Sequence, residues 1–368
     1  MIAPRLEIRL DLIHHNARAL VARLGSRGIG VTGVTKATLG REEIARELLS
    51  AGVTSIGDSR IENIESMVRA GVAAEFSLIR SPMISQVDRV VAHADTSHNT
   101  EIAVVERLSL AAQRQGRMHG VLLMVELGDL REGILPEDLL AFARKAMRLP
   151  NIAVRGIGTN LACQSGVSPD DEKMGALSSL ANSMEDNLGL AVEVVSGGNS
   201  ASLAWALASA DRGRVNTLRL GEAILLGRDP LQRNPIEGLE TSAFTLVAEV
   251  IECKQKPSMP WGQINQAAFG PAPRRANRGV ASQAILALGC QDVDPRGLAP
   301  PPGIEVLGAS SDHLVVGTGR TRPAIGSEVR FQLNYSALLR AMTSPFVALD
   351  FLSPPAGPFG GSASTASA

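Results

Sequence analysis

Cysteine, aromatic residues and long apolar runs are all scarce in this sequence of 368 residues. Its three cysteines, Cys163, Cys253 and Cys290, are widely spaced and form no CxxC pair, which disfavours a disulfide scaffold and favours a reducing compartment. No apolar run is long enough to span a membrane, and the opening MIAPRLEIRLDL lacks the apolar core of a signal peptide. We therefore expect a cytoplasmic protein with no membrane partner.

The chain also has no excess of acidic or of basic residues. The 36 basic and 37 acidic residues are well mixed and give a net charge of −1. Without a basic stripe the chain has no electrostatic basis for binding nucleic acid. Hydrophobic residues make up 45% of the chain, which is enough for a sizeable core. The length suits a barrel of roughly 200–250 residues plus a smaller module.

Short β-branched or apolar runs alternate with longer stretches of helical periodicity in the first two thirds of the chain. The strand candidates are residues 29–36, 53–58, 75–80, 90–96, 119–127, 152–159, 191–197 and 216–220. The helix candidates are residues 41–51, 60–70, 100–115, 136–149, 171–187 and 201–210. Eight such units predict an α/β fold of the TIM (β/α)8 barrel type. The eighth run is weak, so seven strands plus an extension is the alternative.

The pattern changes after about Pro235, where strand-like segments follow one another with proline and glycine between them. These strand candidates are residues 245–253, 284–288, 304–307, 313–316 and 328–333, and a helix is expected at 336–342. We therefore predict a C-terminal all-β domain after the barrel. The expected domains are a barrel at 12–234, a β domain at 235–352 together with 1–11, and a disordered tail at 353–368.

Lys36 stands at the end of the apolar, β-branched run 29–35, so a buried strand carries one ammonium group to its C-terminal end. Burying an unpaired ammonium group costs free energy or lowers its pKa. A lysine with a lowered pKa is the kind that forms a Schiff base with an aldehyde. The alternative is a lysine whose long side chain simply reaches water.

The seventh strand candidate ends in Ser196-Gly197-Gly198-Asn199-Ser200 and runs into a helix, with Ser200 suited to the N-cap. Two glycines permit close backbone approach, and free N–H groups at a helix start can receive an anion. In barrels of this type, phosphate often binds beyond strands 7 and 8. An ordinary strand-to-helix turn is the alternative. Together with an aldehyde-capturing lysine, a phosphate cradle describes pyridoxal 5′-phosphate (PLP).

In combination, these motifs resemble the alanine racemase superfamily, the barrel-type (fold-type III) PLP enzymes, and most closely its ornithine-racemase-like amino acid racemases. Residues 34–37 are similar to the cofactor-lysine motif, and 128–133 to the GMGRxG segment. The resemblance extends from about Leu6 to Val347. Besides Lys36, it implies cofactor contacts from Arg131, Asn160, Ser196, Gly198, Asn199, Ser200, Arg219, Gly221 and Glu222, with Tyr335 as a further candidate that could instead only pack its ring.

The resemblance places Arg219 at the pyridine nitrogen of the cofactor. Arginine stays protonated and is only a hydrogen-bond donor, so the nitrogen that faces it must offer a lone pair. The ring then stays uncharged and is a weaker electron sink, which favours prompt reprotonation and hence racemisation over transamination. A surface salt bridge is the alternative role for Arg219.

The chain departs from the alanine racemase pattern at three places. Alanine racemases carry a tyrosine shortly after the cofactor lysine, but none stands shortly after Lys36. Asn160 stands where the family has the histidine that stacks on the cofactor. Met124 stands where some members carry a carbamylated lysine. These departures fit the ornithine-racemase-like branch better than alanine racemase proper.

The second proton carrier is not evident, because the β-domain tyrosine of alanine racemases has no counterpart at residues 260–262. Asp312 matches a substrate-site aspartate of the family, and its neighbour His313 can exchange protons near neutral pH. Tyr335 is the other candidate, and an ordinary histidine at a strand start is the alternative role for His313.

The expected function is therefore a PLP-dependent amino acid racemase, with an aldimine at Lys36 and removal and return of the Cα proton from opposite faces. Ornithine, lysine or alanine is the expected substrate, since a basic side chain could meet Asp129, Glu132, Glu222 or Asp292. The alternatives are a metal-assisted PLP enzyme of the D-amino acid dehydratase or aldolase type, and a non-catalytic PLP-binding protein of cofactor homeostasis. We expect no metal site, and the family pattern implies a head-to-tail homodimer.

Overall fold

The computed structural model describes residues 3–270 and 277–352, so the tail expected at 353–368 lies outside the described residues. The chain divides into two compact units. One unit is formed by residues 13–241, and the other by residues 1–12 together with those from 242 onward. The boundaries expected from the sequence are one residue earlier at the first junction and seven residues earlier at the second.

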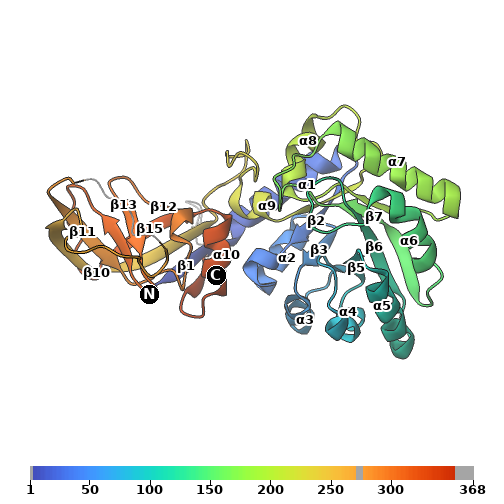
Figure 1. Ribbon diagram of the computed structural model, residues 1–368, viewed down its shortest axis with the longest axis horizontal. Helices are drawn as coiled ribbons and strands as arrows, with labels where there is room; N and C mark the ends of the chain where they lie inside the picture. Colours follow the sequence, from blue (N-terminus) through green and yellow to red (C-terminus); the bar gives the residue numbers. More distant parts are fainter. Residues whose placement is uncertain (1–2, 271–276, 353–368) are drawn as a thin grey trace, which may run out of the picture. The chain divides into compact units, whose positions relative to one another are not determined.

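The unit of residues 13–241 is a closed parallel barrel in which β9 pairs with β2, so the predicted barrel is confirmed (Figure 1). Its eight strands are β2 (Gly30–Val34), β3 (Ser55–Asp58), β4 (Phe76–Leu78), β5 (Thr96–Asn99), β6 (His119–Val125), β7 (Ile152–Thr159), β8 (Val194–Ser196) and β9 (Thr217–Leu220). Parallel strands place their C-terminal ends at one rim, where the loops that follow them gather.

Helices precede and follow the barrel strands and cover the outside of the barrel (Figure 1). They are α1 (Leu10–Gly25), α2 (Glu42–Ser50), α3 (Ile61–Arg69), α4 (Val87–His93), α5 (Ile102–Gln115), α6 (Leu139–Ala146), α7 (Asp171–Leu188), α8 (Leu203–Ala208) and α9 (Glu222–Leu226). In α3, the residues Ile61, Ile64 and Met67 recur on one face and are fully buried. The longest, α7, begins where the Asp170 carboxylate accepts a hydrogen bond from Lys173 N at 2.9 Å.

The strand expected at 90–96 is wrong, because Val90 and Val91 form the buried face of helix α4. The fourth barrel strand is instead β5, a Thr-Ser-His-Asn segment whose four residues are all buried. Two of its side chains form hydrogen bonds inside the barrel, since Ser97 Oγ lies 2.8 Å from His119 Nε2 and Asn99 Nδ2 donates to Ser97 Oγ at 3.0 Å. A search for apolar runs cannot find such a strand.

The other unit is an antiparallel sheet domain, as predicted. Its strands are β1 (Arg5–Arg9), β10 (Phe244–Pro257), β11 (Val280–Leu286), β12 (Leu298–Ala299), β13 (Glu305–Ala309), β14 (Leu314–Gly317), β15 (Glu328–Leu333) and β16 (Ala348–Leu352), and its helix is α10 (Tyr335–Thr343). The order along the sheet is β12-β15-β10-β11-β14-β13, and β1 pairs with both β10 and β16. Leu6, Ile8 and Phe331 are fully buried in its core.

Within residues 3–270 and 277–352, none of the helices is both long and apolar enough to cross a membrane.

Candidate functional site at the C-terminal rim of the barrel

Lys36 opens a single 3-10 turn, Lys36–Thr38, directly after β2. It therefore lies at the C-terminal rim, as the sequence predicts. Its amine has no hydrogen bond or ion pair to any residue that the structure describes, and the side chain is largely shielded from water. Burial lowers the pKa of the Lys36 amine below its ordinary 10.5, and the positive charges of Arg131 and Arg219 lower it further. An amine of this kind is prepared to act as a nucleophile and a base.

Asp58 is a second rim residue, at the C-terminal end of β3, that sequence reasoning missed. Its carboxylate is fully buried and accepts hydrogen bonds from Thr35 Oγ1 at 2.8 Å, Arg60 N at 2.9 Å and Asn63 Nδ2 at 3.0 Å. Burial raises the pKa of the Asp58 carboxyl, and its negative charge in turn favours the protonated form of Lys36. The available signal was its position, because a polar residue that ends a barrel strand commonly serves the site.

The turn after β8 has a cradle-like backbone. Gly198 has φ of +113°, and a Cβ there would lie 2.7 Å from Ser202 Oγ, so only glycine fits. Asn199 is the N-cap of the 3-10 turn Ser200–Ser202, and its side-chain Oδ1 accepts a hydrogen bond from Ala201 N at 2.8 Å. The N-cap role expected for Ser200 is therefore wrong. Ser200 Oγ instead accepts hydrogen bonds from Gly221 N at 3.3 Å and Ala223 N at 3.2 Å, which ties this turn to the start of α9.

Arg219, on β9, is only 6% exposed, so it forms no surface salt bridge. Its guanidinium donates hydrogen bonds to Ser196 Oγ and, at 2.7 Å, to Thr159 O. Burial lowers the pKa of Arg219 to about 10, so it still carries its charge at neutral pH. The two acceptors hold a cation with a fixed orientation inside the barrel.

Asn160 joins the loop after β7 to the turn after β8, because its Oδ1 accepts from Asn199 Nδ2 at 3.1 Å. Its own Nδ2 is buried and has no partner among the described residues. The same Asn199 Nδ2 lies 3.4 Å from the sulfur of Cys163, and the Cys163 side chain is close enough to influence the charge state of Lys36. Cys163 is thus a rim residue that its spacing in the sequence did not reveal.

Arg131 and Glu132 form an ion pair in the loop after β6. Burial acts to lower the pKa of Arg131, but the hydrogen bond to Glu132 raises it overall. Asp129 in the same loop is fully buried, and its carboxylate accepts from Gln164 N at 2.9 Å and from Ser165 N at 3.1 Å. It therefore joins two rim loops and has little capacity left for a substrate.

Non-glycine residues with left-handed backbone occur in three of the rim loops. They are Leu39 with φ of 53°, Leu130 with φ of 54° and Ala162 with φ of 63°. Such conformations cost free energy and often mark functional loops.

Gly221 and Glu222 follow β9, next to Ser200. A Cβ at Gly221 would lie 3.2 Å from the Cβ of Val34, so the close approach of β9 and β2 favours glycine here. Glu222 forms an ion pair with Arg233, and burial raises the pKa of its carboxyl.

The remaining expected residues belong to the β domain. Asp312 and His313 lie just before β14, and the carboxylate of Asp312 accepts a hydrogen bond from His313 Nδ1 at 2.8 Å. This bond lowers the pKa of Asp312 and leaves Nε2 as the other ring nitrogen of His313. Tyr335 begins α10. Asp292 accepts from Gly289 N and Ser344 Oγ, so it serves as a local cap.

A family model for the N-terminal domain of alanine racemase matches residues 8–229. The chain belongs to the alanine racemase family. A lysine racemase of Thermotoga maritima is 41% identical over 94% of this chain and 98% of its own length. An ornithine racemase of Acetoanaerobium sticklandii is 35% identical over 95% of this chain and 99% of its own.

Solved structures in the alanine racemase family share the fold. The alanine racemase of Streptomyces lavendulae superposes with a TM-score of 0.75 at 20% identity, covering 96% of this chain and 98% of its own. A D-threonine aldolase of Filomicrobium marinum reaches a TM-score of 0.73 at 17% identity, covering 93% of this chain and 88% of its own. At these identities the likeness concerns the fold alone. The resemblance drawn from the motifs is confirmed, and with it the expected class of PLP-dependent amino acid racemase.

The rim residues fit the cofactor of this family. PLP needs an amine for its aldehyde, donors for its phosphate and a partner for its ring nitrogen. Lys36 offers an amine without a protein partner, and Asn160 Nδ2 is a buried donor without an acceptor. At Gly198, where a Cβ would lie 2.7 Å from Ser202 Oγ, the turn has the glycine-rich backbone that can approach a phosphate closely. Arg219 supplies a donor group whose orientation is fixed by Ser196 and Thr159.

Proposed function

We propose that this chain racemises a diamino acid, lysine or ornithine, at the C-terminal rim of its barrel, with PLP held on Lys36. The names of the two relatives that match nearly the whole chain support this substrate class. The observation that carries the catalytic assignment is the shielded amine of Lys36, whose pKa is lowered and which lies near Asp58, Arg131 and Arg219.

The cofactor contacts follow from the rim geometry. Lys36 is proposed to hold the aldehyde carbon, and Arg219 to donate to the ring nitrogen. The turn of Ser196, Gly198, Asn199 and Ser200, with Gly221 and the backbone at Glu222, is proposed to surround the phosphate, and Asn160 and Arg131 to contact the ring substituents. Tyr335 is a further proposed contact from the β domain.

The chain's own residues perform the proton transfer. PLP, when bound, delocalises the electron pair that remains at Cα after a proton leaves. The Lys36 amine is proposed to remove or return that proton on one face, because burial lowers its pKa and so favours the uncharged form that can accept a proton. Arg219 keeps its proton, since its pKa of about 10 lies well above neutrality. It therefore orients the ring without becoming an acid, which favours return of the proton to Cα.

The opposite face needs a second proton carrier, and we propose His313 with Asp312 for this role. The hydrogen bond from Nδ1 to Asp312 fixes the ring and leaves Nε2 for proton exchange. Both side chains are accessible, at 46% and 62% exposure. We further propose a head-to-tail homodimer in which the β domain of a second copy covers the rim.

Mixing two inactive variants tests this arrangement. Lys36→Ala and His313→Ala are each expected to be inactive, but a hybrid dimer of the two contains one intact site if sites form between copies. Refolding an equal mixture should then restore about a quarter of the normal activity, because half of the dimers are hybrids with one site each. An inactive mixture would contradict a site shared between copies.

The side chain of the substrate is proposed to lie near Glu132 and Glu222, which are the rim carboxylates not committed to backbone groups. Each already has an arginine partner, so a substrate ammonium group would share the carboxylate with Arg131 or Arg233.

The function is tested by incubating the purified holoenzyme with each L-amino acid and resolving the products by chiral chromatography. We expect kcat/KM for lysine or ornithine to exceed that for alanine by at least about tenfold, because a hydrogen bond to a charged group is worth about 1.5–3 kcal/mol. Preference for alanine would contradict the substrate class, and no isomerisation of any amino acid would contradict the function.

We also propose a cytoplasmic location, supported by the free thiols of Cys163, Cys253 and Cys290. Cell fractionation with antibodies to the protein tests it, and recovery in a secreted or surface fraction would contradict it.

A further inference from the structure

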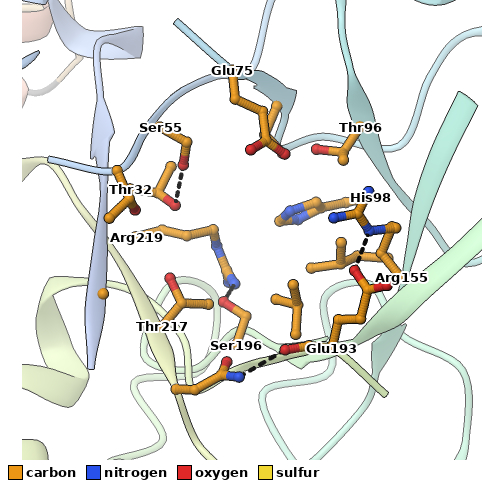
Figure 2. Close-up of a pocket in the computed structure, with 16 residues that line it drawn as sticks. Thr32, Ser55, Glu75, Thr96, His98, Arg155, Glu193, Ser196, Thr217 and Arg219 are labelled. Atoms are coloured by element: carbon orange, nitrogen blue, oxygen red, sulfur yellow. Dashed lines mark hydrogen bonds and ion pairs between the residues drawn. The ribbon is translucent and has the colours of Figure 1, made fainter. Parts of the chain in front are cut away.

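The barrel contains a cavity of about 300 Å³ at the end opposite the rim (Figure 2). Its lining includes residues that begin the barrel strands, such as Gly30, Ser55, Thr96 and Thr217. At its inner end it reaches Arg219, which also belongs to the rim site. We call this space the floor cavity.

The lining of the floor cavity is unusually polar. The interior of a barrel of this type is normally filled by branched apolar side chains. Here Thr32, Ser55, Ser77, Thr96 and Thr217 place hydroxyl groups around the space. Thr32 Oγ1 and Ser55 Oγ lie 2.9 Å apart and bond to each other. A cavity of this size has room for about ten water-sized groups, and its hydroxyl groups can bond to a polar occupant.

The inner end of the floor cavity presents hydrogen-bond donors and positive charge. His98 is only 3% exposed, points into the space and has no hydrogen bond to any residue in the described part of the chain (Figure 2). Arg219 bonds to Ser196 and to the carbonyl of Thr159, but no carboxylate of the described residues pairs with it. A buried charge without a counter-ion is costly, so this end favours an anion.

The open end carries the opposite charge. Glu75 is exposed, lines the cavity and forms no ion pair within residues 3–270 and 277–352. Arg155 and Glu193, also in the lining, lie 2.6 Å apart and neutralise each other. The uncompensated charges are therefore negative at the mouth and positive at the inner end.

We propose that the floor cavity binds a short zwitterion, with its carboxylate toward Arg219 and His98 and its ammonium group toward Glu75. An amino acid with about ten non-hydrogen atoms matches the volume. Diamino acids belong to this class, so the cavity is a second, regulatory site for the substrate or product. That regulatory role rests on the proposed function, whereas the binding itself does not.

Occupancy of the floor cavity acts on the rim through Arg219. A carboxylate beneath the guanidinium compensates its charge and weakens the positive potential that it presents on the rim side. The expected consequence is inhibition that substrate at the rim does not relieve. Because the coupling is reciprocal, cofactor at the rim also changes the affinity of the floor cavity.

The test uses 4-(dimethylamino)butanoate and the holoenzyme. This probe carries both charges, but a tertiary amine cannot condense with an aldehyde. Calorimetry should show binding with Kd on the order of 1 mM. Glu75→Gln should weaken this binding by about two- to fivefold, since one exposed charge pair is lost. The matched control Glu137→Gln, an exposed glutamate outside the cavity, should leave Kd unchanged.

Two further results separate the possibilities. Butanoate, which lacks the amine, should bind equally to the normal protein and to Glu75→Gln. In racemase assays the probe should lower kcat rather than raise KM. No binding, equal binding by both glutamate variants, or purely competitive inhibition would overturn the proposal. If no amino acid is racemised, the calorimetry still decides whether the floor cavity binds the probe. Failure of the proposed function can therefore be told apart from failure of the cavity proposal.

Discussion

The two ends of this barrel are formed by the same eight strands, yet they differ in composition and in the conformation of the chain. The rim gathers Lys36, Arg131 and Arg219, with loops in which non-glycine residues adopt left-handed backbone. The floor is lined by short hydroxyl side chains on regular strands. Positive charges that lower an amine pKa are thus concentrated where the loops can surround a ligand. Arg219 is the residue that both ends share.

The largest expected effect is at the rim. Lys36→Ala removes the amine that is proposed to hold the cofactor and carry a proton. Activity should fall by about 10⁴-fold or more, because a nucleophile and a general base are lost together. A chiral assay of lysine or ornithine measures this. Lys173→Ala, in an exposed ion pair with Asp170, is the control and should keep normal activity. Equal activity of the two variants would contradict the role of Lys36.

Arginine-to-lysine substitutions at the two ends should differ in their effect. In Arg219→Lys, one ammonium group cannot reproduce the planar contacts to Ser196 and Thr159. We expect kcat/KM to fall by about 10- to 100-fold. Arg155→Lys, in a half-exposed ion pair at the floor, should change it less than about twofold. Comparable losses in both variants would mean that the ends are not functionally distinct.

Acid should destabilise the barrel through His119, at the start of β6. Burial lowers the pKa of its imidazole to about 4, whereas the unfolded chain has the ordinary value of about 6.5. As pH falls below 6.5 the unfolded state gains the proton first, so the free energy of unfolding should decrease by up to about 1.4 kcal/mol per pH unit until pH 4. Urea unfolding at pH 7, 5.5 and 4.5 measures this slope.

The decrease in unfolding free energy per pH unit should be smaller in His119→Gln. It should be unchanged in His93→Gln, where the histidine is partly exposed at the end of α4. Equal slopes in the two variants would show that His119 is not the group that takes up the proton.

The smallest expected effect is a difference in unfolding free energy between variants of two threonines, Thr35 and Thr96. Thr35→Val breaks the 2.8 Å hydrogen bond to the buried Asp58, which should cost about 1–3 kcal/mol of unfolding free energy. Thr96→Val removes a floor hydroxyl that only faces the cavity, and should cost less than about 1 kcal/mol with no change in racemase rate. Chemical denaturation measures both. A larger cost at Thr96 would show that the floor hydroxyls are structurally essential.

Much of the barrel was predictable because its strands are apolar and its helices periodic. Lys36 was conspicuous since a charged residue ended an apolar run, and the turn at Gly198 carried its own composition signal. Strand β5 was not predictable in this way, because its four residues are polar and Ser97 finds a partner distant in the sequence, His119.

Other rim features depend on three-dimensional contacts. The role of Asn199 as N-cap, in place of Ser200, depends on how the turn meets Gly221. The nearness of Cys163 to Asn199 depends on the path of the loop after β7. The floor cavity arises from residues on all eight barrel strands, each of which is unremarkable alone.

Identifying the residue that carries the cofactor is the most direct test of the account. Borohydride reduction of the holoenzyme, followed by proteolysis and mass spectrometry, locates the attachment. The account predicts a phosphopyridoxyl group on the peptide that contains Lys36 and on no other peptide. Attachment to Lys145, Lys173, Lys254 or Lys256, or no stable attachment at all, would contradict it.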